Sequence, residues 1–321
     1  YEIADRDWSS DVCSSDLKLE AIWNETDRSF YQEVNDKKLE TAMYKGLIRG
    51  LGDPYSEYMT RQEYQDWLSA TTGSYEGVGI TFSKQKNGTM KVESVNRDGP
   101  AGKAGIKKGD LILRVDGKAY TDQNKLARAI RGDSGTKVSI TFRRGSSTFS
   151  LVLIRRTIQT KTVYSRQRPG NIGYIQITSF EEHTAKEFKE ALKQCEKKKD
   201  RGLIIDLRDN GGGLVDSCVE IADELMGKGI VTYLKDQNGN RKNYRSHAGK
   251  TSLPYVLLIN ENTASASEIL TAAVMDNTDA KVVGQTSYGK GVVQDTRKLK
   301  DESALKLTVM QRSEEHTSEL Q

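Results

Sequence analysis

Apolar residues recur at two different periods along the chain, and the change of period separates three regions. In the first region they are three or four positions apart, which is typical of amphipathic helices. These positions are Leu39, Met43, Leu47, Ile48 and Leu51. Gly52-Asp53-Pro54 predicts the end of that helix, and Thr60 with Glu63 forms a capping box that predicts the start of the next. We expect a helical N-terminal region over residues 18–70.

The second region, over residues 74–155, follows a linker at Thr71–Ser74 and has short apolar runs separated by turn residues. This pattern predicts strands, with one short helix over Gln123–Ile130. The predicted strands are Val78–Phe82, Met90–Val95, Leu111–Val115, Val138–Phe142 and Phe149–Ile154. We expect a small α+β domain.

The third region, over residues 156–311, alternates strands with amphipathic helices. The predicted strands are Gly173–Thr178, Leu203–Leu207, Tyr255–Asn260 and Lys281–Gly284, and the predicted helices are Thr184–Lys198, Leu214–Met226 and Ser267–Asp276. Such alternation is typical of a layered α/β core. The chain as a whole is therefore expected to be multidomain.

The two ends differ in kind from the rest of the chain. Residues 7–17 and 312–321 resemble translations of a DNA-sequencing adapter in its two orientations, and residues 1–6 fit the adjoining primer. We interpret residues 1–17 and 312–321 as adapter read-through and exclude them from fold reasoning. On this interpretation both native termini are missing, and the α/β core is truncated after a predicted strand at Ala304–Met310.

Charge and cysteine content exclude few functions. The chain carries 49 basic and 45 acidic side chains, a formal net charge of +4, which rises to +10 without the two end segments. The basic residues are scattered, which favours a solvated surface over nucleic-acid binding. Cys195 and Cys218 lie on apolar helical stripes and are predicted to be buried free thiols, whereas Cys13 falls in adapter. No apolar run approaches the roughly 18 residues of a membrane span.

Ser265 lies in a small-residue turn between a predicted apolar strand and a predicted helix. The segment reads Asn262-Thr263-Ala264-Ser265-Ala266-Ser267-Glu268-Ile269. Unpaired N–H groups at a helix N-terminus stabilise anions, so the turn favours Ser265 as a nucleophile. The alternative from this segment alone is a serine that merely caps the helix.

A serine nucleophile needs a base, and histidine is nearly unavailable. His183 and His247 are interpreted as surface residues, and His316 falls in adapter. Lys290, between two glycines, serves as a base if burial lowers its pKa, and Gln294 is able to orient its amine without adding charge. The alternative is a flexible loop with an exposed amine.

A third segment, Asp206-Leu207-Arg208-Asp209-Asn210-Gly211-Gly212-Gly213, ends a predicted strand and opens a predicted helix. Its backbone N–H groups are candidates for stabilising an oxyanion. A dinucleotide site is the competing interpretation, but the third glycine of that fingerprint would fall at Asp216.

Together these segments resemble the C-terminal processing, or tail-specific, serine peptidases, and the resemblance covers nearly all of residues 18–311. It includes the segment Leu51–Met59 and the Ser-Ala-Ser-Glu and Gly-Lys-Gly motifs. The resemblance implies a peptidase core of the crotonase/Clp type, with Ser265 as nucleophile, Lys290 as base and Gln294 as its orienting partner. It assigns the oxyanion hole to Gly212 and Ala266, although the family more often has proline where Gly211 stands.

The second region resembles a PDZ domain. Glu76-Gly77-Val78-Gly79-Ile80 matches the loop that holds a peptide's terminal carboxylate, and residues 99–110 match its following turn and helix. The implied peptide-binding residues are Gly77, Val78, Gly79 and Ile80, which hold a tail that adds as a strand. The alternative is that these glycines only shape a hairpin.

The expected partners are proteins with free C-terminal tails, with no metal and no organic cofactor. The family mostly works outside the cytoplasm, often tethered by an N-terminal segment, and some relatives dimerise through helical N-terminal regions. Two functions of other classes stay open: a noncatalytic PDZ scaffold and a crotonase-like acyl-CoA enzyme.

Overall fold

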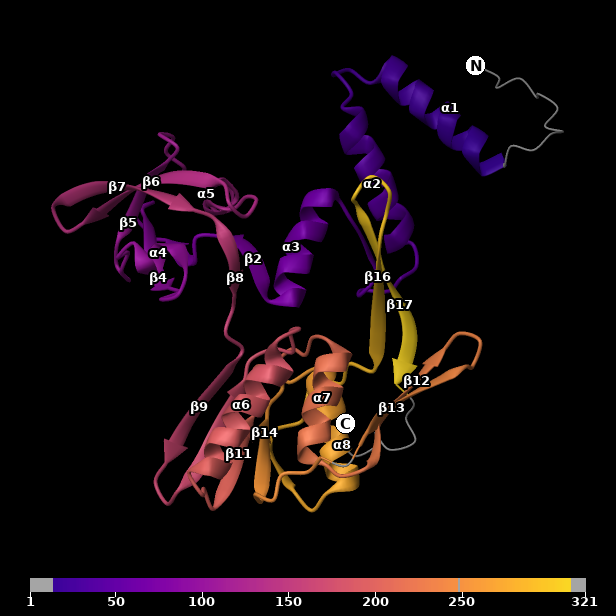
Figure 1. Ribbon diagram of the computed structural model, residues 1–321. Coiled ribbons are helices and arrows are strands. Elements are labelled where there is room, and N and C mark those ends of the chain that lie inside the picture. The colour runs from indigo at the N-terminus through magenta and orange to yellow at the C-terminus, as the bar shows by residue number, and fades with distance from the viewer. Residues whose placement is uncertain (1–13, 248, 313–321) are drawn as a thin grey trace. The chain divides into compact units, whose positions relative to one another are not determined.

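The computed structural model describes residues 14–247 and 249–312 (Figure 1). Chain contacts divide these residues into two compact units, one of residues 14–64 with 294–308 and one of the remainder. The adapter interpretation of residues 1–13 and 313–321 lies outside the described residues, as does Cys13. Among the described residues, no helix is long and apolar enough to cross a membrane.

The first unit combines helices with short strands. Its elements are α1 (Ser14–Ser29), α2 (Asp36–Arg49), β1 (Glu57–Met59) and most of β16 (Val292–Lys298) and β17 (Ala304–Arg312). The Asn35 side chain caps α2 by accepting a hydrogen bond from Lys38 N at 3.0 Å. β1 pairs antiparallel with β17, with Tyr58 opposite Leu305. The prediction that residues 18–70 are helical is therefore wrong at β1. The sequence did not reveal this strand because its partner, β17, lies about 250 residues away along the chain.

The helix α3 (Arg61–Thr72) begins at the predicted capping box. Thr60 N donates to Glu63 Oε2 at 2.8 Å, and Glu63 N donates to Thr60 Oγ1 at 3.4 Å. The helix runs into the predicted linker, so only Gly73 separates it from β2 (Ser74–Gly77). Gly73 has φ +66°, a backbone conformation that glycine adopts at little cost.

The second region folds as an α+β domain around its own apolar core. Its five-stranded antiparallel sheet has the order β3-β4-β5-β6-β7, and β2 pairs with β8 in a separate ribbon. The bounds are β3 (Ile80–Lys84), β4 (Met90–Val95), α4 (Pro100–Lys103), β5 (Leu111–Val115), α5 (Gln123–Ile130), β6 (Lys137–Arg144), β7 (Ser147–Ile154) and β8 (Arg156–Gln159). Val78 and Gly79, predicted as strand, form the turn between β2 and β3.

The third region is a layered α/β core, as its alternating pattern predicted. The sheet order is β15-β14-β11-β10-β9, with only β9 antiparallel to its neighbour. The bounds are β9 (Val163–Arg168), β10 (Ile172–Ile177), α6 (Thr184–Lys197), β11 (Gly202–Asp206), α7 (Val215–Leu225), β14 (Tyr255–Ile259), α8 (Ala266–Asn277) and β15 (Lys281–Gly284). The helices α6, α7 and α8 lie along this sheet (Figure 1).

A hairpin of β12 (Gly229–Asp236) and β13 (Arg241–Ser246) follows α7. It was not predicted, because its side chains alternate poorly and its β12 strand finds a partner in the distant β17, where Leu234 lies opposite Arg312. Cys195 and Cys218 are buried free thiols, as predicted. His183, interpreted from the sequence as a surface residue, has a side chain only 12% exposed.

Candidate active site

Ser265 lies at the turn that joins β14 to α8, where it is the N-cap of the helix. Its φ of +57° and ψ of −116° are unusual for a residue with a side chain. Such strain costs about 1–3 kcal/mol and persists only where surrounding contacts hold it. A strained serine between a strand and a helix is also the geometry of nucleophile elbows.

The Glu268 carboxylate supplies those contacts from one turn along α8. Its Oε2 accepts a hydrogen bond from Ser265 N at 2.7 Å, and the side chain is only 1% exposed. The same oxygen accepts a hydrogen bond from Lys290 N at 2.9 Å. The backbone nitrogens of Ser265 and Lys290 are therefore no farther apart than the sum of these two distances.

The loop that carries Lys290 has further contacts with the same carboxylate. Glu268 Oε1 accepts hydrogen bonds from Ser287 Oγ at 2.7 Å and from Gly289 N at 2.6 Å. Tyr288 N donates to Thr263 O at 2.9 Å, on the Ser265 turn itself. A single buried carboxylate thus joins the two segments that the sequence proposed as nucleophile and base.

The glycine-rich loop between β11 and α7 lies against the Ser265 turn. A Cβ atom on Gly212, which has φ +99°, would lie 2.7 Å from Ala264 O and 2.8 Å from Ser265 Cβ. Ala264 N donates to Asn210 O at 3.0 Å, and Ser267 Oγ donates to the same oxygen at 3.0 Å. This close approach requires glycine at position 212 and brings the predicted oxyanion segment beside Ser265.

The two predicted oxyanion donors differ in their surroundings. Ala266 is fully buried at the first helical position of α8, where the N–H groups of the first turn lack helical partners. Gly212 N donates to Asn210 Oδ1 at 2.9 Å. For Gly212 N to reach a substrate oxygen, that hydrogen bond must first be broken.

Gln294 lies in the other compact unit from Ser265 and Lys290. Its Nε2 donates to Thr308 Oγ1 at 3.1 Å. The described geometry therefore joins Ser265, Gly212, Ala266 and the Lys290 backbone.

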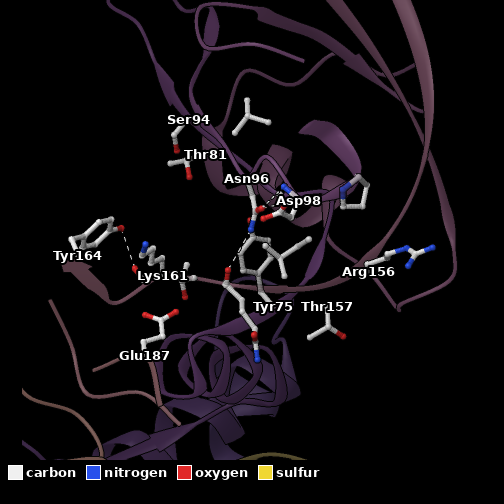
Figure 2. Close-up of a pocket in the computed structure, with 17 residues that line it drawn as sticks. Tyr75, Thr81, Ser94, Asn96, Asp98, Arg156, Thr157, Lys161, Tyr164 and Glu187 are labelled. Carbon is white, nitrogen blue, oxygen red and sulfur yellow. Dashed lines mark hydrogen bonds between the residues drawn. The ribbon is translucent and has the colours of Figure 1, made fainter. Parts of the chain in front are cut away.

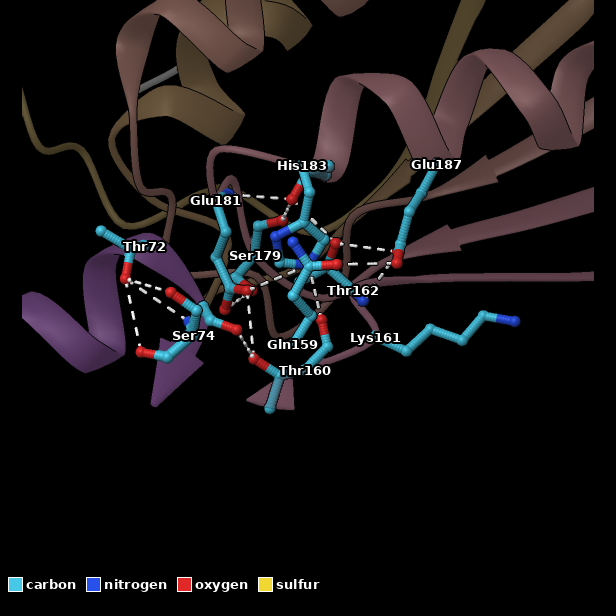
Figure 3. Close-up of polar contacts among 12 residues, drawn as sticks. Thr72, Ser74, Gln159, Thr160, Lys161, Thr162, Ser179, Glu181, His183 and Glu187 are labelled. Atoms are coloured by element: carbon cyan, nitrogen blue, oxygen red, sulfur yellow. Dashed lines mark hydrogen bonds and ion pairs between the residues drawn. The ribbon is translucent and has the colours of Figure 1, made fainter. Parts of the chain in front are cut away.

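A polar cluster joins the two linkers that flank the second domain, residues 71–74 and 159–162, to the α/β core (Figure 3). Thr160 Oγ1 donates to Gly73 O at 2.6 Å and to Glu181 Oε2 at 3.3 Å, and His183 Nε2 lies 2.5 Å from Thr160 O. Figure 3 shows Thr160, Glu181 and His183 pointing toward one another. The linkers are therefore joined to the loop that precedes α6.

That same loop also supports the glycine-rich segment. Phe180 N donates to Gly212 O at 2.9 Å, and Leu214 N donates to Phe180 O at 2.7 Å. A Cβ atom on Gly213 would lie 2.1 Å from Phe180 O, so glycine is required there. One residue, Phe180, thus separates the linker cluster from the candidate oxyanion loop.

The predicted carboxylate-binding loop lies between β2 and β3. Val78 O accepts from Ala101 N at 2.9 Å, and Gly79 O accepts from Asn96 N at 2.8 Å. In a trans peptide the carbonyl and the next N–H point in opposite directions, so Gly79 N faces away from Ala101 and Ile80 N away from Asn96. Gly79 has φ +81°, which favours glycine.

A hollow of about 840 Å³ adjoins this loop (Figure 2). Its wall includes Gly79 and Asn96 from the second domain, Lys161 from the linker and Glu187 from α6. Asn96 Nδ2 donates to Gln159 O at 3.4 Å across one side of it. Positively and negatively charged side chains, such as Lys161 and Glu187, therefore line the hollow beside the predicted carboxylate-binding loop.

Sequence reasoning missed three residues that shape the site: Glu268, Asn210 and Glu181. A signal for Glu268 was present, because Ser265-x-x-Glu268 is a capping-box pattern. For Asn210 and Glu181 the decisive partners are residues distant in the sequence, so no local pattern pointed to them.

Comparison with known proteins gives two family matches. Residues 171–321 match peptidase family S41, and residues 91–144 match the PDZ domain. The chain is 37% identical over 297 residues to carboxy-terminal processing protease CtpA of Bacillus subtilis (strain 168), a match that covers 91% of this chain and 64% of that protein. It is 36% identical over 301 residues to a probable CtpA-like serine protease of Staphylococcus haemolyticus, covering 91% of this chain and 60% of that protein.

Among solved structures, the photosystem II D1 C-terminal processing protease superposes with a TM-score of 0.53 at 25% identity, covering 94% of this chain and 89% of that one. The chain spans less than two thirds of the length of the two CtpA relatives. The two family matches fall on the layered α/β core and on the α+β domain. The chain belongs to the C-terminal processing peptidases of family S41 that carry a PDZ domain.

Proposed function

We propose that this protein is a serine endopeptidase that cleaves proteins after recognising their C-terminal tails. The observation that carries the proposal is the shared carboxylate oxygen of Glu268, which holds Ser265 N at 2.7 Å and Lys290 N at 2.9 Å. It supports a catalytic pair of Ser265 and Lys290, because a hydroxyl nucleophile requires a base beside it.

In the proposed reaction Ser265 Oγ attacks the scissile carbonyl carbon while Lys290 Nζ accepts the hydroxyl proton. The tetrahedral intermediate then collapses: the peptide C–N bond breaks, and Lys290 returns the proton to the leaving amine. Water, deprotonated by Lys290, then attacks the acyl-enzyme ester. The bond between the acyl carbon and Ser265 Oγ breaks, Lys290 returns the proton to Oγ, and the new C-terminus is released. The chemistry requires a neutral amine before attack, which desolvation of Lys290 would favour.

We assign the oxyanion hole to the N–H groups of Ala266 and Gly212. The helix N-terminus of α8 favours negative charge at Ala266. Breaking the Gly212 N–H contact with Asn210 Oδ1, now 2.9 Å, would complete the hole. Gln294, four positions after Lys290 in the sequence, is assigned to orient its amine.

We further propose that the PDZ domain binds the tail carboxylate at Gly77, Val78, Gly79 and Ile80. The outward N–H groups of Gly79 and Ile80 support this assignment, since backbone N–H groups capture terminal carboxylates. In the α/β core, helices are layered on a mostly parallel sheet, which supports the crotonase/Clp type of architecture.

By analogy with the family, we propose that the protein works outside the cytoplasm, tethered by an N-terminal segment, and that it forms a homodimer.

The proposed mechanism is tested by replacing the proposed base, Lys290, and the proposed nucleophile, Ser265. A protein substrate with an unstructured tail is incubated with the wild-type chain and with Lys290→Ala, Ser265→Ala and the exposed-lysine control Lys281→Ala. We expect at least about a hundredfold loss of cleavage rate for the first two variants and an unchanged rate for the control. Circular dichroism checks that each variant is folded.

Unchanged cleavage by Lys290→Ala would remove that residue from the mechanism. Tail binding without cleavage by the wild type would favour a noncatalytic PDZ scaffold instead. Turnover of an acyl-CoA thioester in place of peptide would favour the crotonase-like alternative.

A further inference from the structure

The PDZ domain has a side-chain amide hydrogen-bonded to the open edge of its sheet. β3 is the edge strand, and Gln123 is the first residue of α5. Lys84 N donates to Gln123 Oε1 at 2.9 Å, and Gln123 Nε2 donates to Phe82 O at 3.5 Å. One amide group therefore both accepts from and donates to the main chain of β3.

The two main-chain groups lie on the side of β3 that an added strand would use. On its other side β3 pairs with β4, where Phe82 lies opposite Val92 and Lys84 opposite Met90. Phe82 and Lys84 are two positions apart, so their hydrogen-bonding groups face the same edge. An added antiparallel strand would donate to the Phe82 carbonyl and accept from the Lys84 N–H, as the Gln123 amide does.

The helix that carries Gln123 is fixed against the domain. Leu126 and Ile130 of α5 are 2% and 5% exposed in the apolar core. Asp122 caps the helix by accepting a hydrogen bond from Lys125 N at 2.8 Å. Gln123 is thereby held in the first turn, within reach of β3.

We propose that Gln123 stands in for the main chain of a bound tail and limits how much of the tail pairs with β3. The inference rests on the proposed binding of a tail carboxylate at Gly79 and Ile80. From that end, roughly the last three residues of a tail pair before the strand reaches the Phe82 carbonyl. Residues farther upstream gain no main-chain pairing unless they displace the Gln123 amide.

This arrangement makes Gln123 a determinant of recognition length. Specificity then comes from the last few side chains and the carboxylate, and upstream sequence contributes little. Such a groove accepts many tails that share only their final residues. The upstream chain is left unpaired and able to extend toward a catalytic site.

The test compares two tail peptides, one of three residues and one of eight that ends in the same three. Binding is measured by calorimetry to the full chain carrying Ser265→Ala, with mass spectrometry to check that the peptides stay intact. In this background the two peptides are expected to bind within twofold of each other. Adding Gln123→Ala is expected to tighten binding of the longer peptide about fivefold and leave the shorter one unchanged.

Asn124→Ala is the matched control, since it removes the neighbouring amide of α5 and should not alter the length dependence. Amidated peptides serve as the control for tail recognition. If free-carboxylate peptides bind more tightly than amidated ones but Gln123→Ala leaves the ratio of the two lengths unchanged, the role of Gln123 is wrong. If binding never depends on the free carboxylate, the proposed tail recognition fails and the inference fails with it.

Discussion

At the scale of single residues, Glu268 is the residue on which the candidate site depends. It is buried, and its two oxygens together accept hydrogen bonds from Ser265 N, Ser287 Oγ, Gly289 N and Lys290 N. A carboxylate suits this position because it offers only acceptors. It contacts Ser265 and Lys290 through their backbone nitrogens, so in the proposed mechanism it is a positioning residue.

Glu268→Gln should lower kcat of peptide cleavage by about ten- to a hundredfold with little change in KM. The amide NH₂ would face backbone N–H groups that need an acceptor, which misplaces Ser265 relative to Lys290 and weakens transition-state positioning. Steady-state kinetics on one tailed substrate measures both constants. The exposed Glu261→Gln is the control, and wild-type kcat in Glu268→Gln would refute the positioning role.

At the scale of elements, a partly buried ion pair joins two strands of the antiparallel sheet of the PDZ domain. Asp110, which is 1% exposed, accepts hydrogen bonds from Arg144 Nε and Nη2 at 2.7 Å each, and from Lys107 N at 2.9 Å. The hydrogen bonds from Arg144 hold the pKa of the Asp110 carboxyl below its usual value of 3.8. The pair joins the start of β5 to β6.

Asp110→Asn should destabilise the PDZ domain at pH 7 by about 1–3 kcal/mol, because Arg144 loses its charged partner. The folded-state pKa is depressed, so the contribution of Asp110 is fully present above the unfolded value near 3.8 and is lost as pH falls below it. Urea unfolding at pH 7 and near pH 3 should show the wild-type advantage shrinking at the lower pH. The exposed Asp98→Asn should show neither effect, and an acid-independent difference would contradict the assignment.

At the scale of the whole molecule, the part of the chain that the structure describes has two separate apolar cores, one in the PDZ domain and one in the peptidase core. Cys195 and Cys218 belong to the second of these. Burial raises the pKa of the Cys195 thiol to about 11 and also raises that of Cys218. Both thiols are therefore protonated and shielded in the folded chain.

Both thiols should resist alkylation at pH 8 until the peptidase core unfolds. Labelling with iodoacetamide, followed by peptide mapping to separate them from Cys13, measures each site. Asp110→Asn should leave these labelling rates unchanged while it lowers the stability of the PDZ domain, because the two cores are distinct. If Asp110→Asn instead increased the labelling rates of both Cys195 and Cys218, the two cores would unfold together.

Several elements were predictable from the sequence because local pattern and tertiary environment agree there. Met90–Val95, Leu111–Val115 and the helix Gln123–Ile130 were predicted with their observed bounds. The strands of the parallel sheet were found within about a residue, since buried strands read as continuous apolar runs. β1, β9 and β13 were missed because they are short or polar. β12 was missed although it is eight residues long and contains Ile230, Val231 and Leu234.

The sequence by itself determined the domain order, the alternating α/β core, the family resemblance and the choice of Ser265 and Lys290 as candidates. These features depend on residue type, spacing and period, which are local. Only the tertiary structure decided that the Glu268 carboxylate joins the Ser265 turn to the Lys290 loop, that the Asn210 carbonyl accepts a hydrogen bond from Ala264 N, and that Gln123 lies on the edge of β3. Each of these contacts joins segments whose distance in space follows from packing, and packing is a property of the whole fold.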